Sequence, residues 1–481
     1  MTAMLTDIIT GALREHGDAP AVADRHTTLT YRELDAAANR YATALAALLT
    51  GRDRPRVGIQ AANSADYVVA YLAALRAGCV PFLIDRAAGP QETEGIQRGC
   101  GLDLLVHEEA TPVPGHGTRL AAPGSLRVTR FPEMPDRPGL HRETEVCRFT
   151  SGSTGSPSCI EFRGEAVYRA AANWAEGTGI SAQDTIVCFA SLSNGLAFNT
   201  SLLSTFLVGA CLRLGSGLPT AGAVTRTLRD SGATRLIGFP ALYESLVRNG
   251  SGPGPLPGLR MAISSAAPLD PGTKRLFEES TGVPLQNYYG IAEAGPLTFA
   301  ADPRTDPGLG QALPGVELRA GAAGEPGVVS VRSQSMGTRY LNAPGVLEQR
   351  IDPDGFYRTG DVGRLRDGSL VLTGRTSQVI NIGGRKIDAV EVSTALAGAP
   401  GVDDAVVLEI TDRHGTAALA AVLAGAPDLD PAAPRRYVAE RLAPYKVPSL
   451  VRIVPRIPRG TSGKPATAEL RRLFDTPQDF Q

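Results

Sequence analysis

Short apolar runs alternate with longer amphipathic stretches through the first 290 residues, and this alternation is the strongest constraint on the fold. The pattern predicts strands at residues 56–60, 79–84, 102–107, 185–190, 234–238 and 260–264, and helices at 64–77, 165–176, 202–208, 240–247 and 271–281. Such alternation is typical of βαβ units, whose parallel strands are covered by helices. The first part of the chain is therefore predicted to be an α/β domain.

The pattern changes after residue 315. Short strands with turn signals up to residue 372, including Asp-Gly at 354–355 and 367–368, predict a small antiparallel or barrel-like unit. Helices near 389–396 and 431–442 and strands near 403–410 and 417–423 predict an α+β segment. The predicted fold class is α/β, with a large N-terminal domain of parallel α/β sheets and a barrel-like unit (residues 1–375) and a small, mobile α+β C-terminal domain (residues 376–481). Residues 111–140 are proline-rich and are predicted to form a surface excursion without a helix.

Charge and cysteine content narrow the possible partners. The formal net charge of −1 provides no global field to concentrate nucleic acid or acidic lipid. The N-terminus lacks the basic and apolar regions of a signal peptide, and no apolar run reaches the roughly 18 residues of a membrane span. The six cysteines form no C-x-x-C pair, which fits a reducing compartment. We therefore expect a cytoplasmic protein with neither nucleic-acid nor membrane partners.

A loop rich in small residues is the strongest local signal. Residues 149–157 read Phe-Thr-Ser-Gly-Ser-Thr-Gly-Ser-Pro and follow an extended segment at 146–149. Small residues let backbone N–H groups approach an anion, and hydroxyl groups add further donors. The segment is not a Walker A loop, and by itself it fits a phosphate cradle and a plain surface loop about equally well.

Four further motifs follow this loop along the chain. They are Asn-Tyr-Tyr-Gly-Ile-Ala-Glu at 287–293, Tyr-Arg-Thr-Gly-Asp at 357–361, Gly-Arg at 374–375 with Gly-Gly at 383–384, and Gly-Thr-Ser-Gly-Lys at 460–464. In this order, the motifs resemble those of the acyl-adenylate-forming superfamily, which includes acyl-CoA synthetases, peptide-synthetase adenylation domains and luciferases. The resemblance begins at Leu-Thr-Tyr-Arg-Glu-Leu (29–34) and extends to residue 464, nearly the whole chain.

The resemblance implies a binding site for ATP and Mg²⁺. The β- and γ-phosphates would lie in the loop formed by Thr150, Ser151, Gly152, Ser153, Thr154 and Gly155. Glu293 would bind Mg²⁺, Tyr289 would stack on adenine, Asp361 would accept hydrogen bonds from the ribose hydroxyls, and Arg375 would reach ribose or phosphate. Simpler alternatives are a surface acid for Glu293, a core aromatic for Tyr289 and a turn residue for Asp361.

Lys464 is the residue that the resemblance implies for catalysis, together with Glu293. An ammonium between the carboxylate and the α-phosphate would stabilise charge in the transition state. The alternative is a solvated surface lysine, but the chain has only four lysines, and this one ends the late glycine-lysine motif.

The resemblance also implies two half-reactions in one site. A carboxylic acid would attack ATP to give acyl-AMP and pyrophosphate, and a thiol would then displace AMP. Gly383 and Gly384 would let the pantetheine arm approach closely, although they also fit an ordinary turn. The predicted enzyme is therefore an AMP-forming ligase that joins a small carboxylic acid to CoA or to the phosphopantetheine of an acyl carrier protein.

Small residues dominate the segments expected to bind the acid, which are Asn194, Gly195, Ala197, Ala266, Gly290 and Ala294. Gly195, Ala197, Ala294 and Gly295 would leave a roomy pocket, which favours an aryl or other bulky acid. Asn194 stands where the family often has a histidine or an aromatic residue, and it fits a contact to the substrate headgroup and a helix cap equally well.

Two departures from the family pattern weaken phosphate binding. Ser158 replaces a usual lysine and Ala292 a usual threonine, and Arg163 is a candidate substitute for the missing cation. These changes leave two alternative functions open. One is an AMP-forming diazotase acting on nitrite and an aryl amine, and the other is a catalytically silent nucleotide- or acyl-binding homologue.

Overall fold

The computed structural model describes residues 4–120, 124–150, 158–215, 220–248, 252–265, 269–306, 308–321, 325–375, 379–382, 385–411, 417–426, 428–442, 444–459 and 465–474. The chain divides into two compact units. The first consists of Met1–Glu317 and Val331–Tyr357, and the second of Leu318–Ser330 and Arg358–Gln481. Residues 318–330 and 358–375 thus group with the C-terminal part, whereas the domain boundary expected at residue 375 stays a prediction.

The first unit contains an eight-stranded sheet in the order β21-β9-β8-β4-β3-β5-β7-β6. Strands β3, β4, β5 and β8 run parallel, and antiparallel strands complete both edges. The strands are β21 (Arg339–Tyr340), β9 (Cys159–Arg163), β8 (Thr144–Phe149), β4 (Val80–Leu83), β3 (Arg56–Gln60), β5 (Leu104–His107), β7 (Arg127–Arg130) and β6 (Thr118–Leu120).

A second, seven-stranded sheet has the order β14-β13-β12-β10-β11-β1-β2, and its pairs are parallel except β1–β2. Its strands are β14 (Leu285–Asn287), β13 (Met261–Ser264), β12 (Arg235–Gly238), β10 (Thr185–Cys188), β11 (Cys211–Leu214), β1 (Pro20–Ala23) and β2 (Thr28–Thr30). Two short pairs follow, β15 (Gly290–Ile291) with β16 (Gly295–Pro296) and β17 (Thr298–Phe299) with β18 (Gln311–Ala312).

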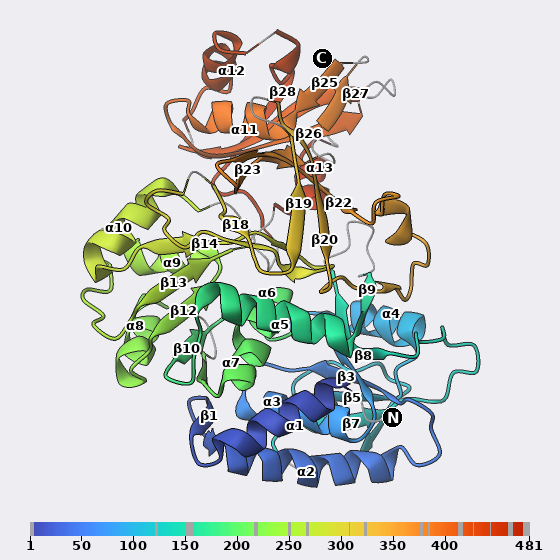
Figure 1. Ribbon diagram of the computed structural model, residues 1–481. Helices are drawn as coiled ribbons and strands as arrows, with labels where there is room; N and C mark the ends of the chain where they lie inside the picture. The colour runs from blue at the N-terminus through green and yellow to red at the C-terminus, as the bar shows by residue number, and fades with distance from the viewer. Residues whose placement is uncertain are drawn as a thin grey trace. The chain divides into compact units, whose positions relative to one another are not determined.

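Helices cover these sheets, as the alternation predicted (Figure 1). They are α1 (Met4–His16), α2 (Tyr31–Leu48), α3 (Ala65–Arg76), α4 (Pro90–Cys100), α5 (Gly164–Thr178), α6 (Gly195–Ala197), the π-helix η1 (Phe198–Leu203), α7 (Ser204–Val208), α8 (Ala221–Asp230), α9 (Pro240–Val247), α10 (Pro271–Thr281) and the 3₁₀ helix η2 (Glu348–Arg350). Val224, Tyr243 and Phe277 of α8, α9 and α10 share one buried cluster with Leu236 of β12 and Ala262 of β13. Apolar burial therefore fixes these three helices on the second sheet.

The second unit includes most of a four-stranded sheet in the order β19-β20-β22-β23, made of β19 (Val316–Arg319), β20 (Gly327–Ser333), β22 (Tyr357–Arg366) and β23 (Ser369–Arg375). At the turn between β22 and β23, Asp367 has φ of 53° and Gly368 has φ of 79°. Two consecutive positive φ values are typical of a type I′ hairpin turn, which an Asp-Gly pair favours. The antiparallel strands predicted for this region are thus present.

The remainder of the second unit is α+β. It contains β24 (Val379–Ile382), β25 (Arg385–Asp388), α11 (Ala389–Ala397), β26 (Val402–Thr411), β27 (Ala417–Gly425), α12 (Ala432–Ala439), the 3₁₀ helix η4 (Pro444–Lys446), β28 (Leu450–Val454) and α13 (Thr467–Arg472). Alternate residues of β27 enter different clusters, since Ala421 packs with Val392 of α11 and Val422 packs with Leu470 of α13. The β26–β27–β28 sheet is therefore covered on both faces.

Most of the predicted elements are confirmed, and the exceptions are local. The helix predicted at 202–208 begins earlier, because the π-helix η1 precedes α7. The excursion at 111–140 contains β6 and β7, and none of its described residues is helical. No described helix is both long enough and apolar enough to cross a bilayer.

Candidate active site

The predicted phosphate loop connects β8 to β9. Phe149 pairs with Cys159 as the last ladder position before the loop, and the Thr150 N–H donates a hydrogen bond of 3.0 Å to the Ser158 carbonyl. Ser151, Gly152, Ser153, Thr154 and Gly155 lie outside the described residues. The structure therefore fixes the two ends of the loop, and phosphate binding by its centre stays a prediction.

Glu293 lies in the turn between β15 and β16 and is half-buried. The Tyr340 hydroxyl donates a hydrogen bond of 2.5 Å to Glu293 Oε1, and the Gly337 N–H donates one of 2.6 Å to the Glu293 carbonyl. Tyr340 belongs to β21, where it pairs with Ile160 of β9. The predicted metal ligand is thus attached, through one tyrosine, to the strand that follows the phosphate loop.

The Tyr340 hydroxyl has polar neighbours besides Glu293. Close by, Arg350 Nη1 donates a hydrogen bond of 3.3 Å to the Tyr357 hydroxyl. Burial raises the pKa of Tyr340 well above its usual value, and the neighbouring Glu293 carboxylate raises it further. Tyr340 therefore keeps its proton and acts as a donor to Glu293 at physiological pH.

Glu293 is suited to hold a divalent cation. Among the described residues, no arginine, lysine or histidine nitrogen lies within 4 Å of its carboxylate, so the charge is not neutralised by an ion pair. A carboxylate with one oxygen held by a hydroxyl donor is a suitable hard ligand for Mg²⁺. The side chain is half-buried and hydrogen-bonded, so its orientation is constrained, and its role as a metal ligand stays a prediction.

Arg148 is a site residue that the motifs did not indicate. It lies on β8 with 4% of its surface exposed, and its Nη2 donates to the Ala292 carbonyl at 3.3 Å. Its guanidinium carbon lies 4.3 Å from the Phe162 ring centre. Burial lowers the pKa of Arg148 to about 10, which leaves it protonated at neutral pH. An arginine inside a strand expected to be buried was the available sequence signal.

The small residues expected at the acid pocket lie on two segments of the first unit. Gly195 and Ala197 form α6, and Gly290 and Ala294 belong to the β15–β16 region. A Cβ on Gly290 would come within 2.6 Å of the Gly295 carbonyl oxygen, so the close strand pair requires glycine there. Ala266 lies outside the described residues. Contact of these residues with the acid stays a prediction.

Asn194 caps α6. Its Oδ1 accepts a hydrogen bond of 2.9 Å from the Leu196 N–H, which confirms the helix-cap interpretation. A contact of its amide with the substrate headgroup is not required for this role and stays a prediction.

Tyr289 is buried beside a packed aromatic group. It is 6% exposed, and its N–H donates to Thr298 Oγ1 at 3.0 Å. The neighbouring Tyr288 ring meets Trp174 edge-on, with centroids 5.0 Å apart. This burial agrees with the simpler core interpretation of Tyr289, and its stacking on adenine stays a prediction.

Asp361 and Arg375 lie in the second unit on neighbouring strands. They occupy directly opposite positions of the antiparallel β22–β23 pair. Asp361 is 2% exposed, and its N–H donates to Thr359 Oγ1 at 3.0 Å. Asp361 is therefore a buried strand residue, and the alternative of a turn residue is wrong. The register brings together two residues predicted to bind the ribose region.

The remaining residues predicted for catalysis and thiol binding lie in short segments between described residues. Lys464 lies between Arg459 and Pro465, which form an antiparallel bridge. Gly383 and Gly384 lie between β24 and β25, where Ile382 pairs with Arg385. Lys464, Gly383 and Gly384 are outside the described residues, and their roles stay predictions.

Arg163 does not supply the missing cation, which corrects one expectation. It pairs with Thr144 at the end of the β8–β9 ladder opposite to the loop, about 16 Å along the strand from Ser158 at roughly 3.3 Å per residue. Its Nη1 lies 3.9 Å from Glu143. Strand register therefore places Arg163 away from the predicted phosphate loop.

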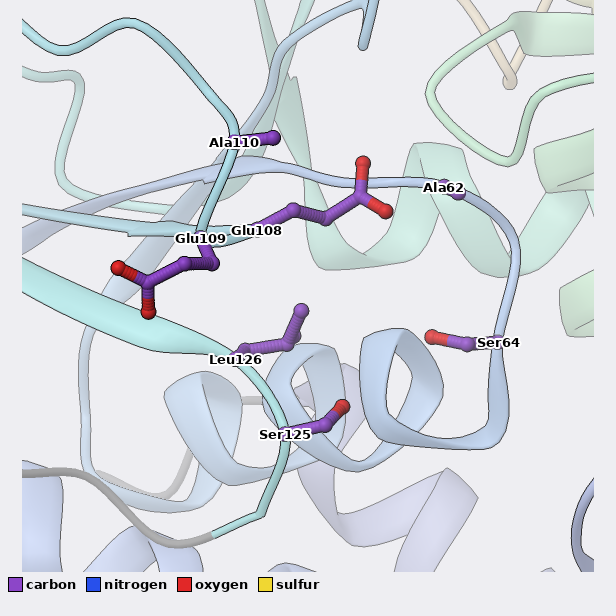
Figure 2. A pocket seen from close by; sticks show the side chains of 7 residues that line it. All are labelled: Ala62, Ser64, Glu108, Glu109, Ala110, Ser125 and Leu126. Atoms are coloured by element: carbon purple, nitrogen blue, oxygen red, sulfur yellow. The ribbon is translucent and has the colours of Figure 1, made fainter.

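A separate cavity of about 360 Å³ lies beyond the carboxyl ends of β3 and β5 (Figure 2). Its lining residues are Ala62, Ser64, Glu108, Glu109, Ala110, Ser125 and Leu126, none of which was predicted to bind ATP or acid. Arg86 pairs with Glu108 at 2.7 Å and Arg119 with Glu109 at 3.1 Å. Both carboxylates of the lining therefore have an arginine partner.

Comparison with known families decides the assignment of this site. The AMP-binding enzyme family matches residues 10–341, and the AMP-binding enzyme C-terminal domain matches residues 391–464. The chain belongs to the AMP-binding enzyme family.

Relatives of this AMP-binding enzyme include a curated ligase and a synthetase. Phosphinothricin tripeptide synthetase PhsC of Streptomyces viridochromogenes is 31% identical over 96% of the chain, which spans only 44% of that synthetase. The 3-hydroxybenzoate–CoA ligase of an Aromatoleum strain is 27% identical over 95% of the chain and 94% of the ligase. The crystal structure of ATP-bound MatB from Rhodopseudomonas palustris aligns with a TM-score of 0.85 at 21% identity, over 98% of this chain and 99% of MatB.

These comparisons confirm three predictions for the AMP-binding enzyme. The superfamily assignment is correct, and so is the fold class of a large α/β domain with a small C-terminal domain. The enzyme class is also confirmed as an AMP-forming acid–thiol ligase, which forms acyl-AMP from ATP and then a thioester. The diazotase and the silent homologue receive no support from these relatives.

Proposed function

We propose that this ligase activates an aryl or similarly bulky carboxylic acid in the presence of Mg²⁺ and transfers it to CoA or to a carrier-protein phosphopantetheine. The observation that carries the proposal is the Glu293 carboxylate, which Tyr340 holds beside the strand that follows the phosphate loop. Mg²⁺ bound at Glu293 would supply charge neutralisation for the phosphates.

Some residues of the chain would bind ATP, and Lys464 would stabilise the transition state. The loop from Thr150 to Gly155 would hold the phosphates by its backbone N–H groups, and Asp361 and Arg375 would hold the ribose. Lys464 would donate hydrogen bonds to the carboxylate and the α-phosphate as negative charge develops. Each residue would act by positioning or by charge, and a proton relay is not needed for acyl-AMP formation.

The preference for an aryl acid has two supports. The Phe162 and Phe198 rings flank Arg148, whose guanidinium adjoins Gly195 of α6. The curated relative from Aromatoleum is named for 3-hydroxybenzoate. Flat apolar rings favour an aromatic ligand because they provide large buried contact surfaces.

The acceptor thiol is either CoA or a carrier protein. Relatives named as CoA ligases favour CoA, whereas the relative PhsC is a peptide synthetase and keeps a carrier protein under consideration. The segment with Gly383 and Gly384 would admit the pantetheine arm for either acceptor. A location in the reducing cytoplasm completes the proposal.

The decisive experiment follows pyrophosphate release and acyl-AMP mass with ATP, Mg²⁺ and a panel of aryl, aliphatic and amino acids. Lys464→Ala should abolish the signal, while Lys446→Ala should retain it, because Lys446 pairs with Glu391 at 2.5 Å outside the predicted site. Addition of CoA or a phosphopantetheinylated carrier then identifies the acceptor. Absence of pyrophosphate release with every carboxylic acid would refute the proposal.

A further inference from the structure

Arg148 is a buried cation with unusually few partners. Among the described residues, its Nε has no hydrogen-bond acceptor and no carboxylate lies within 4 Å of the guanidinium. The one hydrogen bond that its side chain makes within the described part of the chain, to the Ala292 carbonyl, is long at 3.3 Å. A buried charge without an ion pair is costly, so a guanidinium in this state requires an explanation.

The other two buried arginines of the described chain are better satisfied. Arg235 pairs with Asp184 at 3.2 Å and donates to two backbone carbonyls at 3.1 and 2.8 Å. Arg56, like Arg148, has no acceptor at its Nε, but it donates through both terminal nitrogens, to the Cys100 and Pro138 carbonyls. Those contacts explain both side chains as structural, whereas most of the Arg148 donors have no acceptor among the residues that the structure describes.

The position of Arg148 links the two segments that carry the small residues expected at the acid. A Cβ on Gly195 would lie 2.5 Å from Arg148 Nη1, so the guanidinium occupies the space that a side chain at Gly195 would take. Its Nη2 contacts Ala292, which precedes Glu293. The rings of Phe162 and Phe198 lie 4.3 and 5.3 Å from its guanidinium carbon.

From these contacts we propose that Arg148 determines specificity for a dicarboxylic acid, by pairing with the carboxylate that does not react. This inference deepens the proposed function and rests on it, since it names the class of acid that the same site activates. A planar guanidinium with free donors matches a carboxylate in a two-point hydrogen bond. The substrate would thus supply the anion that the described protein lacks.

The reacting carboxylate is a poorer partner for Arg148. Two hydrogen bonds from one guanidinium would engage both carboxylate oxygens and reduce the charge on the oxygen that must attack phosphorus. The apolar rings around Arg148 also resemble an acyl pocket more than a phosphate site. The second carboxylate of a diacid gains the pairing without this penalty.

The test compares aromatic and aliphatic dicarboxylic acids with their monomethyl esters, using kcat/KM for pyrophosphate release. The wild type should prefer the diacid. Arg148→Met should lower kcat/KM for the diacid by about 30-fold or more, as expected for loss of one partner of a buried charge pair. The kcat/KM for the monoester should fall much less, so the variant should no longer prefer the diacid over the monoester. The KM for ATP should stay unchanged.

Arg56→Met is the matched control, because it removes another buried guanidinium from the same sheet and should leave the diacid-to-monoester ratio unchanged. If Arg148→Met does not fold by thermal unfolding, Gly195→Ala provides the second variant, since its Cβ displaces the guanidinium and should lower the same ratio.

Three results would overturn the inference while leaving the ligase function intact. In the first, the wild type activates monoesters at least as well as diacids. In the second, Arg148→Met lowers kcat/KM equally for diacids and monoesters. In the third, Arg148→Met raises the KM for ATP with every acid, which would place Arg148 at the phosphates. Absence of activity with all carboxylic acids would instead refute the proposed function itself.

Discussion

The Tyr340 hydroxyl donates a 2.5 Å hydrogen bond to Glu293 Oε1, although 47 residues separate the two along the chain. Tyr340 is held by the pairing of β21 with β9, and Glu293 by the turn between β15 and β16. The hydrogen bond therefore orients the carboxylate from outside its own segment. Partners of this kind typically contribute about 10- to 100-fold to metal affinity or activity.

Tyr340→Phe should raise the Mg²⁺ concentration needed for half-maximal pyrophosphate release by about 10-fold or more, because Glu293 loses its orienting donor. The measurement is a Mg²⁺ titration at saturating ATP and acid. Tyr243→Phe is the control, since the Tyr243 hydroxyl lies 2.8 Å from the Ile263 carbonyl in the helix-covered core. An unchanged Mg²⁺ requirement in Tyr340→Phe would contradict the assignment of Glu293 as metal ligand.

Glu293→Gln removes the negative charge of the side chain but keeps its size and its acceptor oxygen. The amide oxygen can still accept the Tyr340 hydrogen bond, but the negative charge that binds Mg²⁺ is lost. We expect kcat/KM for pyrophosphate release to fall by at least about 100-fold, more than for loss of an orienting partner, with little change in the thermal unfolding temperature. Glu165→Gln, at an exposed acid of α5, should retain activity. Equal activity in both variants would show that Glu293 acts structurally.

The order of strands and helices could be predicted because apolar periodicity is a local property of the sequence. The strand at 56–60 and the helices at 240–247 and 271–281 are present with the predicted bounds. The π-helix Phe198–Leu203 could not be predicted, because its wider turn has no distinct hydrophobic period.

The parts of the site that depend on contacts between segments distant in sequence could not be predicted. Arg163 was a candidate substitute for the missing cation, but the β8–β9 register places it at the opposite end of the ladder from the loop. Arg148 was missed because a charge within an apolar strand does not form a motif, and its significance appears only when Gly195 and Ala292 are known to surround it. The Tyr340–Glu293 hydrogen bond likewise depends on the pairing of β21 with β9.

Asn194 provides a test of whether α6 faces the acid. Asn194→Asp retains a cap oxygen for the Leu196 N–H, so stability should be preserved, but the new negative charge should repel an anionic substrate. We expect the KM for the acid to rise by about 10-fold or more. Asn194→Ser, a neutral cap, should leave both stability and KM near wild type. An unchanged KM in Asn194→Asp would place the acid away from this helix.

The pH dependence of stability should report on His107, which is fully buried at the end of β5. Its Nδ1 lies 2.7 Å from the Glu108 carbonyl and its Nε2 2.9 Å from Thr129 Oγ1, and burial lowers its pKa below the usual 6.5. The unfolded chain therefore binds a proton at this residue at a higher pH than the folded chain does, so the unfolding free energy should decrease as the pH falls below about 6.5, by up to about 1.4 kcal/mol per pH unit. Urea unfolding between pH 7.5 and 5 should show a smaller decrease for His107→Gln than for the wild type. The control is His26→Gln at an exposed position, whose unfolding free energy should change with pH as that of the wild type does. If the unfolding free energy of His107→Gln decreased with pH as steeply as that of the wild type, His107 would be excluded as the origin of the pH dependence.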